Sequence, residues 1–74
     1  MTSVAYYVVP REKLWAIRLN GKYFGPCPTK RLATDVAISA AKKASAAEGC
    51  RARVLVQAGN RFHTEWETGK PTAH

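Results

Sequence analysis

Hydrophobic and polar positions follow two different periods along this chain, and the change of period marks its elements. Residues 4–9 are β-branched or aromatic except for one alanine, so they predict a strand that ends before Pro10. Residues 14–19 and 22–24 predict two more strands, joined by Asn20-Gly21. Both central residues of a two-residue type I′ turn need positive φ, which this dipeptide adopts at low cost. The pair therefore predicts a tight hairpin.

The register of that hairpin assigns its side chains to two faces. With the turn at residues 20 and 21, Ile17 pairs with Phe24 and Arg18 pairs with Tyr23. We expect one face to turn toward the core and to carry Trp15, Ile17, Leu19 and Phe24. Arg18 and Tyr23 then lie together on the outer face.

The period becomes helical from Thr29 to Glu48, where alanine is the commonest residue. Thr29 is the expected N-cap and Gly49 the expected left-handed C-cap, while the segment 25–28 is expected to break the preceding strand. One arc of the helix is apolar and should pack on the sheet; it holds most of the alanines together with Leu32 and Val36. Ile38 lies on the opposite arc, where it is either a singly exposed apolar residue or a partner contact.

Two further strands are predicted after Gly49, at residues 51–57 and 61–66, around the loop Ala58-Gly59-Asn60. In the first, the apolar face is formed by Ala52, Val54 and Val56. In the second, alternation sets Phe62, Thr64 and Trp66 against Arg61, His63 and Glu65. Burial of the apolar sets would leave Arg51, Arg53, Arg61 and His63 on the solvent face.

These elements predict an α+β fold. A β-hairpin, a long alanine-rich helix and a second β-hairpin would build an antiparallel sheet of four to five strands, with the helix packed on one face. The length of 74 residues allows one domain, which we assign to residues 1–67. Residues 68–74 lack periodicity and are expected to form a flexible C-terminal tail.

The net charge of the chain indicates which classes of partner it could bind. Twelve Lys and Arg against five Asp and Glu give a net charge of +7, which favours a nucleic acid or an acidic protein surface. The first residues lack a signal-peptide pattern and no run reaches the roughly 18 apolar residues of a membrane span, so we expect a cytoplasmic protein without a membrane partner. Cys27 and Cys50 flank the helix, which would hold them about 30 Å apart, so both are expected to be free thiols.

Catalytic chemistry is poorly provided for. His63 is the only histidine before the C-terminal residue, and the five acidic residues are scattered in sequence, so no acid–base pair is indicated. We therefore expect no enzyme, no cofactor and no metal site. Cys27, close to the start of a helix with Lys30 and Arg31, is either a reactive thiolate or a small apolar residue that fills a turn.

Basic residues and one tyrosine would project from the strands and their turns, and they form the candidate binding site. Phosphate contacts supply most non-specific affinity for nucleic acid, and a two- or three-stranded sheet can enter the major groove. The candidate residues are Arg11, Lys13, Arg18, Lys22, Tyr23, Arg51, Arg53 and Arg61. We expect a non-catalytic nucleic-acid-binding accessory domain, with DNA favoured over RNA. The alternatives are a protein-interaction module or inhibitor that docks on an acidic protein or on a second copy, and a surface that is merely charged and soluble.

Two resemblances accompany these residues. The chain resembles a small bacterial and phage domain family of unknown function. The resemblance rests on Val8-Val9-Pro10, Trp15-Ala16-Ile17, the alanine-rich helix, Val54-Leu55-Val56 and Gly59-Asn60. It implies strand-strand-helix-strand-strand order and no known activity. A narrower part of the chain is similar to the plant AP2-type and phage-integrase arm-binding DNA domains. The residues that carry this similarity are Trp15-Ala16-Ile17, Gly21-Lys22, Phe24-Gly25, Thr29, Ala33, Ala40 and Ala41. That similarity implies a three-stranded sheet in the major groove, with Arg18, Lys22 and Tyr23 facing DNA. The charged first strand of those domains is absent here, because residues 4–9 carry no charge.

Overall fold

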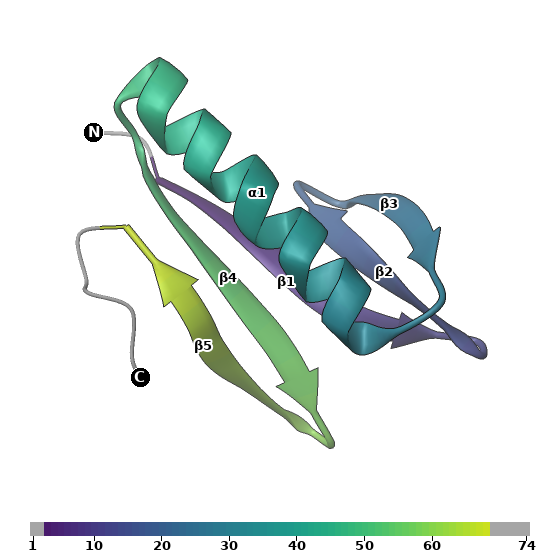
Figure 1. Ribbon diagram of the computed structural model, residues 1–74. Helices are drawn as coiled ribbons and strands as arrows, with labels where there is room; N and C mark the ends of the chain where they lie inside the picture. Colours follow the sequence, from purple (N-terminus) through teal and green to yellow (C-terminus); the bar gives the residue numbers. More distant parts are fainter. Residues whose placement is uncertain (1–2, 69–74) are drawn as a thin grey trace.

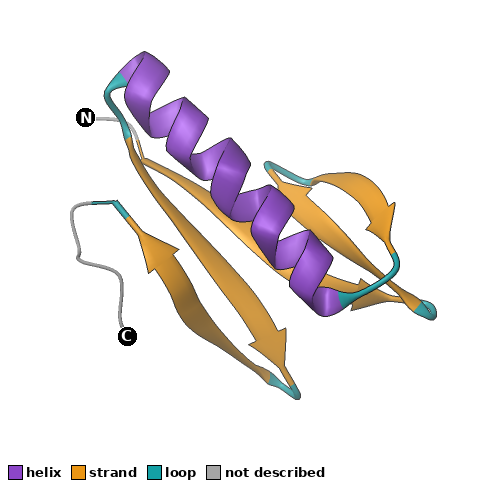
Figure 2. Ribbon diagram, in the orientation of Figure 1, coloured by secondary structure: helices purple, strands orange, loops and turns teal. Residues whose placement is uncertain are grey.

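The structure, a computed structural model, describes residues 3–68, which form five strands and one helix. Three strands come first, β1 (Ser3–Arg11), β2 (Leu14–Leu19) and β3 (Lys22–Cys27), followed by the helix α1 (Lys30–Glu48). The strands β4 (Arg51–Ala58) and β5 (Arg61–Glu67) complete the fold. Figures 1 and 2 show the helix lying along one face of a single sheet. The predicted α+β class with one helix on one sheet face is confirmed.

The sheet is mixed, which corrects the expectation of a purely antiparallel one. Its strand order is β3-β2-β1-β4-β5, with β1 parallel to β4 and every other pair antiparallel. The parallel pair arises because α1 carries the chain back along the sheet after β3, so that β4 starts at the same end as β1. The long apolar run of β1 is typical of a central strand that has neighbours on both sides.

The turns and helix caps follow the local signals. Asn20 and Gly21 have φ values of 53° and 79°, as a type I′ turn requires. The Thr29 side chain accepts a hydrogen bond from the Leu32 backbone N–H at 3.1 Å, and Gly49 ends the helix with φ 65°. All three assignments are confirmed. By contrast, β1 continues through Pro10 to Arg11 and β3 continues to Cys27, so both are longer than predicted.

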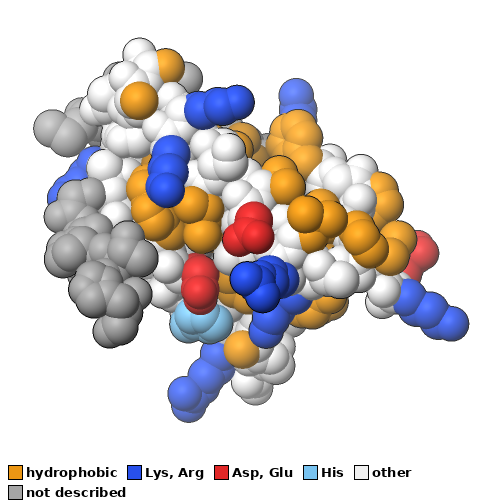
Figure 3. Space-filling model, in the orientation of Figure 1, with side chains coloured by type: hydrophobic (Ala, Val, Ile, Leu, Met, Phe, Trp, Pro, Cys, Tyr) orange, Lys and Arg blue, Asp and Glu red, His pale blue; other side chains and the backbone are white. Residues whose placement is uncertain are grey.

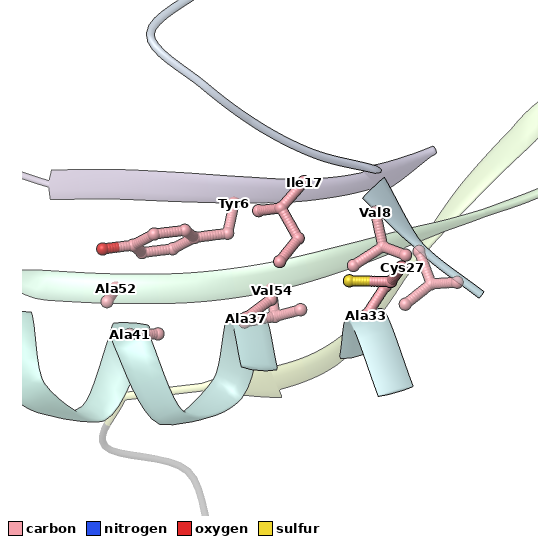
Figure 4. Packing of buried hydrophobic residues seen from close by; sticks show 10 residues of the cluster. Tyr6, Val8, Ile17, Cys27, Ala33, Ala37, Ala41, Ala52 and Val54 are labelled. Carbon is pink, nitrogen blue, oxygen red and sulfur yellow. The ribbon is translucent and has the colours of Figure 1, made fainter. Parts of the chain in front are cut away.

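The core lies between α1 and the four strands β1 to β4. Ala33, Ala37 and Ala41 are fully buried and face larger side chains from the sheet (Figure 4). The buried sheet residues are Tyr6, Val8, Ile17, Cys27, Ala52, Val54 and Val56. Cys27 and Cys50 are both free and buried, so the expectation of two free thiols is confirmed. Small helix residues opposite large strand residues allow the helix axis to lie close to the sheet.

Several predicted burial assignments are wrong at the flanks of this core. Phe24 keeps its register with Ile17 but is 50% exposed, because β3 is an edge strand beyond the centre of the helix contact. Leu32 and Val36 are each 45% exposed, whereas Ile38 is half-buried against the core. The helix is thus rotated about its axis relative to the expected arc, centred on the line Ala33-Ala37-Ala41.

The start of the expected tail is held in place. Thr68 donates its backbone N–H to the Ala52 carbonyl at 2.8 Å, and its hydroxyl accepts the Ala52 N–H at 2.9 Å. The rest of the predicted tail, 69–74, lies outside the described residues. No helix in residues 3–68 combines the length and the apolar character needed to cross a membrane.

We expect Ala37→Leu to destabilise the protein by about 1–3 kcal/mol, because the added methylene groups have no space beneath the helix. Urea unfolding would measure the change. The matched control is Ala46→Leu, at an exposed position of the same helix, which should change stability by less than about 0.5 kcal/mol. Equal destabilisation by the two variants would contradict the alanine contact described above.

Candidate functional site

The face of the sheet opposite α1, called the open face below, is not covered by any other helix or strand of residues 3–68. Its members follow from the register, because directly paired residues share a face. Tyr6 and Val8 are buried toward the helix, so Tyr7 and Val9 belong to the open face. One row of paired residues crosses all five strands on this face: Tyr23, Arg18, Tyr7, Leu55 and Thr64.

An irregularity between β4 and β5 brings a third aromatic ring to the open face, beside this row. Leu55 pairs with Thr64 but Val54 pairs with Trp66, so the register shifts by one residue at this point. The shift sends Trp66 toward the core and Phe62 to the open face. There the rings of Tyr7 and Phe62 meet edge to face, with centroids 5.4 Å apart.

The same shift corrects the predicted face of β5. Phe62 and Thr64 were expected on the buried side, with Arg61 and His63 outside. Instead, His63 pairs with Val56 and Arg61 pairs with Ala58, both on the helix side of the sheet. A shift of one residue inverts the faces of the residues before it, because side chains alternate with a period of two.

Arginines lie on both sides of this row, toward the two ends of the strands. At one end, the Arg11 guanidinium lies 4.0 Å from the centre of the Tyr23 ring, beside an open hollow of about 250 Å³ whose lining also includes Leu14 and Ala16. At the other end, Arg51 and Arg53 line a shallow hollow of about 270 Å³. Glu67 lies opposite Arg53 in the β4–β5 pairing, so this end also carries a negative charge.

The eight predicted site residues therefore separate into two groups. Arg11, Arg18, Tyr23, Arg51 and Arg53 lie on the open face, with Arg11 and Arg51 at its opposite ends. Lys13 lies in the β1–β2 turn, Lys22 pairs with Leu19 on the helix side, and Arg61 is at the helix side of an edge strand. All eight are exposed.

Sequence reasoning missed Tyr7 and Phe62 as members of this face. For Tyr7 the signal was weak, because β1 is apolar on both faces and alternation does not distinguish them. For Phe62 it was misleading, because the strand pattern alone does not reveal the register shift. By contrast, the alternation of β4 correctly predicts that Leu55 lies on the same face as Arg51 and Arg53.

The helix side of the molecule has a different character. A groove of about 380 Å³ between the first half of α1 and the neighbouring strands is lined by Arg31, Asp35, Ile38, His63 and Glu65, among others. His63 Nε2 and Glu65 Oε2 are 2.8 Å apart in an exposed pair. In Figure 3, which shows this side, basic and acidic side chains are interspersed. The helix side therefore carries charges of both signs.

No three His, Cys, Asp or Glu side chains within residues 3–68 are grouped so that they could hold a metal ion. Comparisons of the chain with protein-family models, with curated proteins and with solved structures find no match. Function must therefore be inferred from the open face and its neighbours.

Chemical modification can test which tyrosines the open face exposes. Tyr23 is 49% exposed and Tyr6 is 7% exposed, so tetranitromethane should nitrate Tyr23 first and Tyr6 last. Peptide mass spectrometry over a time course would read the order. In urea-unfolded protein the difference should vanish, and nitration of Tyr6 as fast as Tyr23 in the folded protein would contradict the face assignment.

Proposed function

We propose that this protein is a non-catalytic domain that binds nucleic acid on the open face. The observation that supports the proposal is the presence of four arginines and three aromatic rings on one uncovered sheet face. The arginines are Arg11, Arg18, Arg51 and Arg53, and the rings are those of Tyr7, Tyr23 and Phe62.

Arginine suits this role because its planar guanidinium group donates paired hydrogen bonds to phosphate oxygens and also stacks on flat rings. All four arginines of the open face are exposed, so phosphates can approach them. If each contacts one phosphate, the logarithm of the binding constant should fall with the logarithm of salt concentration with a slope of about −3.

A second candidate function, docking on another protein, is favoured by a separate observation on the helix side. Leu32, Val36 and Phe24 are large apolar residues that remain 45–50% exposed. Apolar side chains of this size at the surface are more typical of a protein contact than of a phosphate contact. This candidate uses a different surface, so variants of the open face should leave it intact.

Fluorescence anisotropy with labelled oligonucleotides at low salt tests the nucleic-acid proposal. Arg18→Ala/Arg53→Ala should weaken binding roughly tenfold or more and flatten the salt slope by about two, because two phosphate contacts are lost.

The matched control is Lys42→Ala/Lys43→Ala, which removes the same charge from exposed positions on the helix. This variant should bind nearly as well as the unmodified protein. The proposal fails if the protein does not bind at tens of micromolar, or if the two double variants lose affinity equally. A protein that is retained from nuclease-treated lysate by both double variants, but not by Leu32→Ser/Val36→Ser, would instead support the second candidate.

A further inference from the structure

We infer that the open face binds single-stranded nucleic acid in preference to a duplex, and that the unpaired bases stack on its aromatic rings. The inference rests on the proposed function and specifies its ligand. Three features of the face support it: its width, the position of its aromatic rings and the alternation of rings with arginine.

The width of the sheet disfavours entry into a groove. Five strands at a spacing of about 4.8 Å span about 19 Å, whereas the major groove of B-form DNA is about 12 Å wide. The arginines of the open face are spread over β1, β2 and β4, with β3 and β5 beyond them on either side. No two or three strands that carry these arginines protrude as a free ribbon, which is what groove insertion requires.

The aromatic rings offer stacking surfaces that a duplex cannot use. Tyr23 and Phe62 are 49% and 45% exposed on the open face, and Tyr7 lies half-buried beside Phe62. Bases in a duplex are already stacked on their neighbours, so only an unpaired base can place its flat side on such a ring. A duplex would meet these rings with its sugar–phosphate backbone.

Rings and a cation alternate along the row that crosses the strands. Tyr23 is paired with Arg18, and Arg18 is paired with Tyr7, so the two tyrosines lie about 10 Å apart across two strand spacings, with the arginine between them. This order matches a strand of nucleic acid that runs across the sheet, with bases on the rings and a phosphate at Arg18. At a rise of about 3.4 Å per stacked nucleotide, the sheet width accommodates about six nucleotides at most.

The charged side chains beside the row are also consistent with a nucleic-acid strand that runs across the sheet. The Arg11 guanidinium lies 4.0 Å from the centre of the Tyr23 ring and occupies one side of it, so a base at this end stacks on the other side of the ring or on the guanidinium plane. Arg53 precedes Leu55 by two residues on β4, so it lies on the same face next to the row and within reach of the backbone of a bound strand. The Glu67 carboxylate lies opposite Arg53 at the β5 edge, which disfavours a phosphate there and limits the path at that side.

The test measures anisotropy of a labelled 20-mer single strand of mixed sequence and of the duplex formed with its complement, at one low salt concentration. We expect the single strand to bind at least about tenfold more tightly. Tyr23→Leu should weaken single-strand binding roughly five- to hundredfold and leave the weak duplex binding unchanged, because only stacking is lost. Tyr23→Phe keeps the ring and should bind as the unmodified protein does.

A second measurement needs no protein variant. A single strand of the same length that lacks bases at every position should bind more weakly than the complete strand, and shortening the complete strand below about six nucleotides should reduce affinity. Duplex binding as tight as single-strand binding, or equal binding of the abasic strand, overturns this inference while leaving the proposed function standing. Absence of binding to either form overturns both.

Discussion

The close contact between the line Ala33-Ala37-Ala41 and the centre of the sheet is the constraint on which the rest of the structure depends. These residues are fully buried, and so are Val8 and Val54 on the strands beneath them. A helix of 19 residues is about 28 Å long, close to the length of β1 and β4, so a single contact covers the central strands from end to end. In so small a chain, larger residues on this line would lift the helix and open the core.

Because α1 covers only one face of the sheet, the side chains of the other face are in contact with water. They must still pack against one another across the strands. The open face meets this requirement with apolar side chains in the middle of the row, such as Tyr7 and Leu55, which are half-buried by their neighbours. Arg18 is paired with Tyr7, and the aliphatic stem of an arginine can lie over apolar surface while its charged end reaches water. At the edge of the face, the Arg11 guanidinium itself lies over the Tyr23 ring. This arrangement places cations beside rings, which is the combination on which the proposed nucleic-acid binding rests.

Small irregularities in the sheet decide which side chains reach that face. The register shift between β4 and β5 turns Trp66 toward the core and brings Phe62 against Tyr7. A second shift lies between Trp15 and Ile17 in the pairing of β2 with β3. There Gly25 has φ 117°, and a Cβ at this residue would come within 3.2 Å of the Cys27 backbone nitrogen, so glycine fits this irregularity. At each irregularity the regular strand pairing is interrupted, and the side chains next to it point to a different face of the sheet than strict alternation would give.

The sequence by itself determined the features that depend on a few neighbouring residues. Asn20-Gly21 specified its turn, Thr29 and Gly49 specified the ends of the helix, and alternation along β4 separated Arg51 and Arg53 from the buried valines. These follow from backbone dihedral angles and from side-chain direction within one element. The open-face residues Arg18 and Tyr23 were also predicted to lie together, because the turn fixes the register of their hairpin.

Tertiary structure alone decided which elements are neighbours. The pairing of Ser3 with Arg51 joins residues 48 positions apart, and periodicity within either strand carries no information about the partner strand or its direction. That parallel pairing places β4 beside β1 and so brings Arg53 close to Tyr7 and Arg18. The rotation of the helix, which exposes Leu32 and half-buries Ile38, follows from where the alanine line meets the sheet. Faces and neighbours are set by packing across the whole core, whereas turns and caps are set by the chain locally.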